Sequence, residues 1–373
     1  MRVAVDARTV YSPVRRGTGK NLIDLYRRIA RLHPDWEFLM FHRQERLTDN
    51  PLTAEANVVP KAIEIQGDRW NLWEQVRLPL AARLANAAVL HSPANTAPRV
   101  PLVPLVMTVH DLLPLDTFPD APESNAWAAN VARGTRIARR IITPSAYTKG
   151  RIVVRFDVAP EKIVVNHWAP DGTCRRVEDP IVIDEARRRY GLRSGQQYVF
   201  GFGAADPRKN TRRIIEAWAT LAPSVRARLA LLLVGIHEPF LTAVRDLARA
   251  LVPEGGWSLM PFAEEADLPA LMSGATALCY PSLGEGFGLP VLDGFACGTP
   301  VITSNSTSLP EVAGDAALLV DPTDVAALGK ALERVATDVE LCNDLRARGF
   351  ERLRAFSWER CAETAAAVLS EAA

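Results

Sequence analysis

The stretch that most constrains this chain spans residues 279–300 and reads CYPSLGEGFGLPVLDGFACGTP. It predicts a short apolar strand, a glycine-rich loop and a helix with Pro290 in its first turn. A helix start offers unpaired N–H groups and the positive end of the dipole, and glycines allow a ligand close to the backbone. The stretch therefore predicts a loop that binds phosphate or a sugar hydroxyl.

Short apolar segments alternate with helical stretches along the rest of the chain. Such alternation predicts open, mainly parallel sheets covered by helices, and ligands of these sheets collect at the carboxyl ends of the strands. Strands are expected at 2–6, 36–41, 61–65, 87–90, 102–109, 140–143, 162–165, 198–203, 228–234, 257–260, 276–280 and 316–320.

The length of 373 residues exceeds what one hydrophobic core normally holds, so two α/β domains are expected. We place the first domain at 1–170 and the second at 197–355. Residues 171–196, rich in proline, glycine and charge, are expected to connect them. A last helix is expected within 356–373.

Charged residues accompany the predicted loops of the second domain. Arg208 and Lys209 follow the strand at 198–203, and Glu285 and Asp293 frame the glycine loop. Cations beside a helix start supply what a diphosphate leaving group needs, because preplaced positive charge stabilises charge that develops there. The alternative is an ordinary solvated turn.

The string from Glu285 to Pro290, followed by Asp293, resembles the signature E-G-F-G-L-P-x-x-E of the retaining, GT-B-fold glycosyltransferases of family 4. The resemblance implies two Rossmann-like domains facing each other across a cleft, with a C-terminal helix crossing back to the first. It also implies that the loop holds the donor sugar and phosphate, that Arg208 and Lys209 grip the diphosphate, and that Asp293 binds the ribose. The loop residues with this implied role are Glu285, Gly286, Phe287, Gly288 and Leu289.

Candidates in the first domain are fewer. A lone histidine after a strand, such as His110 or the second candidate His91, is commonly a structural hydrogen-bonding group. However, the stretch from Val109 to Pro114 is similar to that of bacterial mannosyltransferases, which implies that His110 is catalytic and lies near the sugar and acceptor. Asp111 is expected to orient His110 or to face the acceptor. Gly17 and Gly19 match a family loop that lies opposite the donor diphosphate.

The resemblance implies transfer of a hexose from a nucleotide sugar, with GDP-mannose favoured, to a lipid-linked saccharide of a bacterial surface polysaccharide. The base is expected to contact residues 259–265. No cofactor or metal is expected, since no D-x-D motif lies near these loops. Rival interpretations are a nucleotide-sugar epimerase or hydrolase of the same fold, and a hinged two-domain sugar-binding protein.

Composition adds expectations about location. The first residues contain Asp6 and Arg8, which interrupt any signal-peptide core, so a cytoplasmic protein with reduced cysteines is expected. Arginines cluster at 15–31 and 133–155 and predict either a solvated face or reversible contact with an anionic membrane. Arg136, Arg139 and Arg140 are the residues expected to carry such contact. No nucleic-acid-binding module accompanies them.

Overall fold

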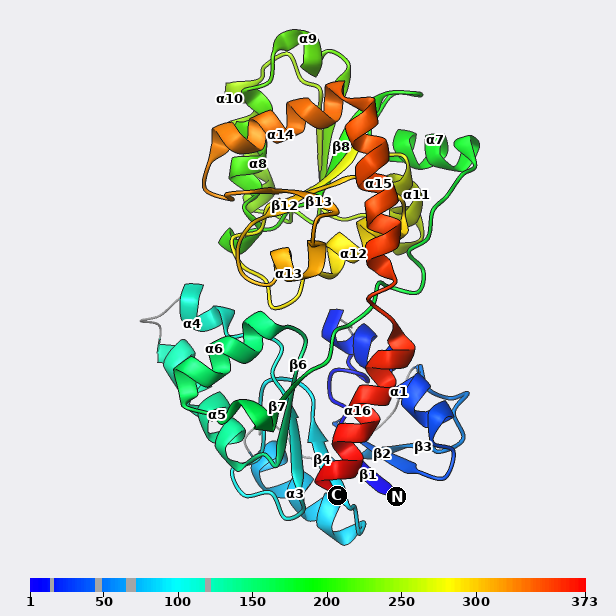
Figure 1. Ribbon diagram of the computed structural model, residues 1–373, viewed down its shortest axis with the longest axis vertical. Helices are drawn as coiled ribbons and strands as arrows, with labels where there is room; N and C mark the ends of the chain where they lie inside the picture. Colours follow the sequence, from blue (N-terminus) through cyan, green and yellow to red (C-terminus); the bar gives the residue numbers. More distant parts are fainter. Residues whose placement is uncertain (14–16, 44–48, 65–71, 118–121) are drawn as a thin grey trace. The chain divides into compact units, whose positions relative to one another are not determined.

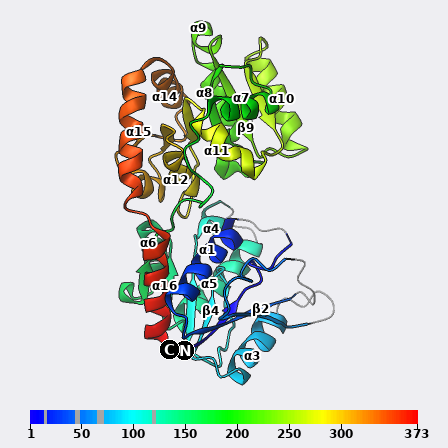
Figure 2. The same ribbon diagram turned by 90° about the vertical axis from the view of Figure 1, so that its right-hand side faces the viewer.

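The computed structural model describes residues 1–13, 17–43, 49–64, 72–117 and 122–373. The chain forms two compact units (Figures 1 and 2). Unit 1 comprises Met1–Trp168 together with Ser357–Ala373, and unit 2 comprises Ala169–Phe356. Among the described residues, no helix is both long and apolar enough to cross a lipid bilayer.

Unit 1 is built on a parallel sheet with the strand order β3-β2-β1-β4-β5-β6-β7. Successive strands progress from β1 to one edge and then from β4 to the other, so the order reverses between β1 and β4. Such a reversal is where parallel sheets bind ligands. The strands are β1 (Arg2–Asp6), β2 (Glu37–His42), β3 (Val58–Ala62), β4 (Val89–Ser92), β5 (Leu105–Thr108), β6 (Arg140–Thr143) and β7 (Ile163–Val165).

Helices cover this sheet on both faces, so every residue of β4 and β5 is buried. The helices are α1 (Gly17–Leu32), the π-helical η1 (Trp73–Arg77), α3 (Leu78–Leu84), α4 (Leu113–Thr117), α5 (Pro122–Ile137), α6 (Ala146–Phe156), the short η2 (Pro160–Lys162) and the C-terminal α16 (Trp358–Ala372). Although last in sequence, α16 packs on α1 and on β4, β5 and β6. Its buried alanines allow this close approach.

Unit 2 repeats the plan with the order β10-β9-β8-β11-β12-β13, which reverses between β8 and β11. The strands are β8 (Gln197–Phe202), β9 (Leu229–Val234), β10 (Trp257–Met260), β11 (Ala277–Tyr280), β12 (Val301–Ser304) and β13 (Ala317–Val320). Its helices are α7 (Pro180–Arg189), η3 (Pro207–Lys209), α8 (Thr211–Ala219), α9 (Pro223–Arg226), α10 (Phe240–Leu251), η4 (Glu265–Asp267), α11 (Leu268–Ser273), α12 (Leu289–Ala296), α13 (Leu309–Ala313), α14 (Val325–Thr337) and α15 (Val339–Leu353).

The core of unit 2 joins one face of this sheet to three helices. Trp218 of α8, Val244 of α10 and Leu332 of α14 are fully buried against Val199 and Leu231 of the sheet. Elsewhere in unit 2, α7 packs on α11 and α12 packs on α15. The predicted fold class, two Rossmann-like α/β units with a returning C-terminal helix, is confirmed.

Several local predictions differ from the structure. Helix α1 begins at Gly17, so Gly17 and Gly19 lie in its first turn and not in a preceding loop. The strand expected at 61–65 lies at Val58–Ala62, where Val58 packs into the core beside Phe38 of β2. The helix expected from 211 to 222 ends at Ala219, because Pro223 has no N–H to donate and begins the new helix α9.

Candidate functional site

The two loops at the reversal of the unit 2 sheet are joined by three side chains. Lys209 ends η3 after β8, Tyr280 ends β11, and Glu285 lies in the glycine loop that follows. The Lys209 Nζ donates to Glu285 Oε1 at 2.8 Å and to Tyr280 Oη at 2.7 Å. The Tyr280 hydroxyl donates to Glu285 Oε1 at 2.6 Å. The structure thus brings together two predicted site residues, Lys209 and Glu285, at the place where such sheets bind ligands.

The charges in this triangle support one another. Burial alone would lower the pKa of Lys209, but its interactions with Tyr280 and Glu285 outweigh burial and raise that pKa, so the ammonium stays charged. Burial, together with the charge of Glu285, raises the pKa of Tyr280, so this phenol stays neutral. The site therefore holds one cation, one carboxylate and one hydroxyl in fixed geometry.

Arg208 differs from its neighbour. Asp206 caps η3 by accepting from the Arg208 N–H at 3.0 Å, and the Arg208 guanidinium binds the same carboxylate. Its backbone carbonyl accepts from Leu283 N at 2.8 Å. Arg208 therefore ties the β8 loop to the β11 loop, whereas the charged side chain that reaches Glu285 is Lys209.

Further side chains hold the loops around the triangle. Asn210, with φ of 59°, donates its amide to Pro281 O at 2.9 Å and to Pro322 O at 2.7 Å. Ser308 Oγ lies 2.8 Å from Glu285 O and 2.7 Å from Phe287 O, and Thr307 Oγ1 accepts from Glu285 N at 3.1 Å. These residues escaped the sequence analysis. The polar run at 304–308, which begins at the end of β12, is the signal that could have revealed Thr307 and Ser308.

Glycine is required at the start of α12. Gly288 is the N-cap with φ of 118°, and a Cβ there would lie 2.6 Å from Leu309 Cδ2. Gly286 and Phe287 precede it in the loop, and Leu289 is the first residue of the helix. The amide groups of this helix start are the kind of donors that a phosphate accepts from.

Asp293, one turn into α12, is linked to a different part of unit 2. Its Oδ1 accepts from Asp171 N at 2.9 Å. Burial raises the pKa of Asp293 to about 7, although the bond from Asp171 N acts in the opposite direction. Glu285 and Asp293 share no hydrogen bond in the described residues, so their joint role in one ligand site stays a prediction.

We expect Asp293→Asn to remove a pH dependence of stability. The folded pKa of about 7 exceeds the ordinary aspartate pKa of 3.8, so the stabilisation present below pH 4 is lost as pH rises through 7. Asparagine can still accept from Asp171 N but has no charge to desolvate. Thermal unfolding should show the variant more stable than wild type at pH 8, by on the order of 4 kcal/mol, and equal to it at pH 4. Parallel curves across this range would contradict the assigned burial, and Asp246→Asn on exposed α10 is the control.

In unit 1, His110 follows β5 and is held on two sides. Its backbone N–H donates to Asn95 Oδ1 at 2.6 Å. Its ring Nε2 lies 2.6 Å from Pro93 O, which can only accept, so Nε2 carries the proton. Burial lowers the pKa of His110 to about 4, partly offset by the Pro93 carbonyl. Its Nδ1 has no hydrogen-bond partner among the described residues. His110 is therefore a neutral ring whose Nδ1 lone pair is buried and has no partner among the described residues.

The other unit 1 predictions have varied outcomes. Asp111 Oδ1 accepts from Leu113 N at 3.0 Å at the start of α4, so it helps to begin that helix. His91 is fully buried, with Nδ1 bonded to the Tyr26 hydroxyl and Nε2 2.8 Å from Thr108 Oγ1. These contacts make His91 a structural residue. Gly17 is exposed, and a Cβ there would meet nothing within 4 Å.

A buried charged network at the carboxyl end of β1 escaped the sequence analysis. Arg8 binds both Asp6, at 2.8 Å through Nε, and Glu74, at 2.8 Å through Nη2, and stacks over Trp73 at 4.5 Å. Thr96 donates to Glu74 at 2.5 Å. The Asp6-x-Arg8 pair directly after the first strand is the sequence signal that could have indicated it.

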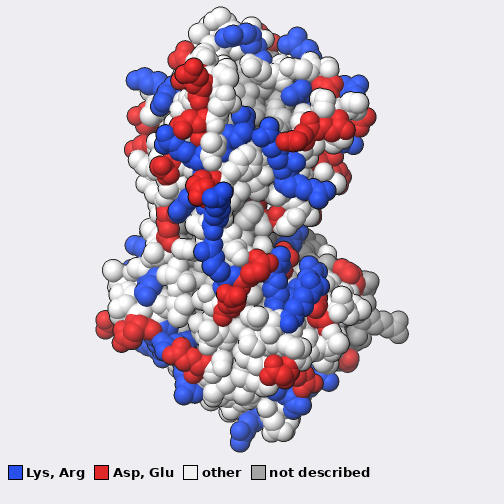
Figure 3. Space-filling model, turned by 45° about the vertical axis from the view of Figure 1, so that its right-hand side comes forward, with Lys and Arg blue, Asp and Glu red and all other residues white. Residues whose placement is uncertain are grey.

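The arginine clusters are largely used within the fold. Arg139 donates to Ala372 O at 3.0 Å, and Arg140 binds the Glu371 carboxylate, so both attach α16 to the sheet. Arg31 binds Glu55 at 2.7 Å. Arg15 and Arg16 lie outside the described residues. On the face in Figure 3, basic and acidic side chains are likewise interspersed. Arg139 and Arg140 thus have partners within the fold, and the expected membrane contact of Arg136, Arg139 and Arg140 stays a prediction.

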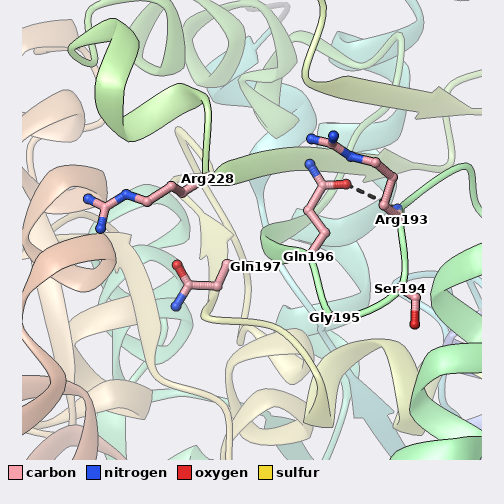
Figure 4. A pocket seen from close by; sticks show the side chains of 6 residues that line it. All are labelled: Arg193, Ser194, Gly195, Gln196, Gln197 and Arg228. Carbon is pink, nitrogen blue, oxygen red and sulfur yellow. Dashed lines mark hydrogen bonds between the residues drawn. The ribbon is translucent and has the colours of Figure 1, made fainter.

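A hollow of about 410 Å³ lies at the amino ends of strands β8 and β9 in unit 2. Its lining comes from the segments that precede β8 and β9, and Figure 4 shows Arg193 N bonded to Gln196 while Arg228 points away. Because ligands of parallel sheets bind at the carboxyl ends, this hollow is separate from the candidate site. The lining residues are Arg193, Ser194, Gly195, Gln196, Gln197 and Arg228.

Comparison with known protein families decides the relationship. The model for glycosyl transferases group 1 matches residues 182–352, and that for glycosyltransferase family 4 matches residues 15–168. The chain belongs to the group 1, family 4 glycosyltransferases. The match to the group 1 model contains Lys209, Tyr280 and Glu285, and the match to the family 4 model contains His110.

Individual members of the family are also similar. The O-antigen chain mannosyltransferase B of Escherichia coli is 34% identical over 224 residues, covering 60% of this chain and 58% of that protein. The serotype-specific mannosyltransferase WbdA of Escherichia coli is 28% identical over 270 residues, covering 70% of this chain and 32% of that protein. The chain therefore spans about three fifths and one third of these relatives.

A solved structure shows the same fold. The crystal structure of Anabaena Alr3699/HepE in complex with UDP and glucose superposes with a TM-score of 0.76 at 18% identity and covers 100% of both chains. The GT-B fold implied by the signature is confirmed.

Proposed function

We propose that the protein is a retaining glycosyltransferase that moves a hexose from a nucleotide sugar to an acceptor hydroxyl. The observation that carries this proposal is the triangle of Lys209, Tyr280 and Glu285 beside the helix start of α12. A cation and the N–H groups of a helix start suit a diphosphate leaving group, and a fixed carboxylate suits the hydroxyls of a sugar. Family membership supports the same activity.

Each residue has a proposed task. Lys209 and the amides at Gly286–Leu289 stabilise the negative charge on the departing diphosphate, and Arg208 holds their loops in place. Glu285 orients the sugar by accepting from its hydroxyls. Asp293 accepts from the ribose. In unit 1, the free lone pair of His110 Nδ1 accepts from a sugar or acceptor hydroxyl.

The proposed donor is GDP-mannose and the proposed acceptor a lipid-linked saccharide of a surface polysaccharide. Two similar proteins are named as mannosyltransferases, one of them of the O-antigen chain, which supports both assignments. For the base, the loop after β10 offers the exposed ring of Phe262. A lipid-linked acceptor also places the enzyme at the inner face of the cytoplasmic membrane.

Product analysis with a panel of radiolabelled nucleotide sugars tests the proposal against its rivals. A transferase produces labelled acceptor and free nucleoside diphosphate. A hydrolase releases free sugar without an acceptor, an epimerase returns an altered nucleotide sugar, and a sugar-binding protein leaves the donor intact. The expected result is a labelled acceptor with retained anomeric configuration, formed with GDP-mannose and with no other nucleotide sugar of the panel.

We expect the reaction to proceed without a metal ion. Lys209 and the helix start already supply positive charge to the leaving group. Adding EDTA should therefore change the rate by less than about twofold. A loss of rate that Mg²⁺ or Mn²⁺ restores would contradict this assignment.

A further inference from the structure

The helical segment formed by η1 and α3 in unit 1 is apolar on two sides. One side enters the core, where Trp73, Leu78 and Ala82 are fully buried. The opposite side should then be polar in an ordinary surface helix. Instead it exposes four large apolar side chains, three of them at 40–44% and the last at 81%: Leu72, Val76, Leu80 and Leu84.

These four residues form a continuous stripe. They are spaced by four residues, so each lies beside the next along one side of the helix. The segment at 99–102 lies against the same helix, because Arg99 N donates to Gln75 Oε1 at 2.7 Å. That segment also exposes the side chains of Val100 and Leu102. Isolated exposed apolar residues are common, but a stripe of this extent indicates an interaction surface.

Within the described segment 72–86, the exposed charges are positive. Between residues 72 and 86, the exposed charged side chains are Arg77 and Arg83, and the one acid, Glu74, is buried in the network with Arg8. Neither arginine forms an ion pair within the described part of the chain. Figure 2 shows α3 at the periphery of unit 1. An apolar stripe flanked by arginines matches an anionic lipid surface, which offers both hydrocarbon and negative charge.

We propose that the face formed by Leu72, Val76, Leu80 and Leu84 with Arg77 and Arg83 docks on anionic membrane lipid. A second copy of the chain is a poorer occupant, because a symmetric contact would bring the arginines of both copies together. The inference rests on the proposed function in that a lipid-linked acceptor lies at a membrane. It places the contact on η1 and α3 and not on the arginine-rich segments.

Vesicle sedimentation, without donor or acceptor, tests this surface. Wild type should bind vesicles of phosphatidylcholine with phosphatidylglycerol and not those of phosphatidylcholine alone. Arg77→Gln with Arg83→Gln should weaken binding by roughly tenfold, and Leu80→Gln with Leu84→Gln by a similar factor. Because these side chains are exposed, all variants should keep the wild-type unfolding temperature and the transfer rate to a water-soluble acceptor.

A matched control uses α6, where Val154 is 83% exposed beside the exposed Arg155. Val154→Gln with Arg155→Gln should leave binding unchanged. An equal loss in this control, or no binding by wild type, would overturn the proposal. So would a dimer in solution that the Leu80 and Leu84 changes dissolve, because the occupant would then be a second copy. None of these results depends on transferase activity, which the product assay measures separately.

Discussion

Replacing Glu285 by glutamine is expected to lower kcat by about 100-fold or more while binding of nucleoside diphosphate is kept or improved. Glutamine preserves the shape of the side chain and can still accept from Lys209 and Tyr280 through its carbonyl oxygen. It cannot provide a carboxylate to the sugar. It also removes the negative charge that now neutralises Lys209, at 2.8 Å, and that would repel a diphosphate.

Steady-state kinetics and calorimetric titration with GDP measure the two effects on one sample. Glu254→Gln is the matched control. Glu254 also pairs with a cation, Arg226, at 2.8 Å, but it precedes β10 and lies away from the candidate site. The control should keep wild-type turnover. Turnover close to wild type in Glu285→Gln would show that the triangle with Lys209 is only structural.

The sequence predicted the strand, loop and helix of this candidate site because its signals are local. A strand, glycines and a helix start at 279–300 lie next to one another in the chain, and the structure has β11 and α12 in that place. Lys209 lies in the loop after the strand predicted at 198–203. In a parallel sheet, the loops that follow the strands all lie at the carboxyl ends. The reversal between β8 and β11 makes these two loops neighbours.

The contacts that fix the site were not predictable in this way. Asn210 bonds to Pro322, and Ser308 to Phe287, across distances in the sequence that no local pattern reports. Arg208 and Lys209 are adjacent and equally charged, yet one binds Asp206 on its own turn and the other Glu285. Which of two neighbouring cations faces a ligand depends on backbone direction, which the sequence does not specify.

The arginine-rich segments show a related limit. A pattern identifies an amphipathic helix, but whether its arginines meet solvent or a carboxyl group depends on packing by distant elements. Arg139 and Arg140 bind the end of α16, far along the chain. Conversely, the apolar stripe on η1 and α3 shares its segment with core residues, so sequence alone assigns all of its apolar positions to the core.

Replacing Lys209 by methionine is expected to weaken GDP binding by roughly 10- to 100-fold, because a charge-assisted contact to the diphosphate is lost. Asp293→Asn should weaken it less, by about threefold or less, since Asp293 would meet neutral hydroxyls. Calorimetric titration gives this order. Lys330→Met, on the exposed side of α14, is the control and should bind GDP as wild type does. Equal losses for Lys209 and Asp293 would mean that the diphosphate lies elsewhere.

The double variant Lys209→Met with Glu285→Gln separates attraction from repulsion. Removing Lys209 alone leaves Glu285 as an unpaired carboxylate bonded only to Tyr280, close to where the diphosphate would bind. Part of the loss in Lys209→Met is then repulsion by that carboxylate. Neutralising Glu285 should therefore restore some of the GDP affinity, by about threefold to tenfold relative to Lys209→Met. Equal GDP affinity in the double variant and in Lys209→Met would show that Glu285 does not act on the bound diphosphate.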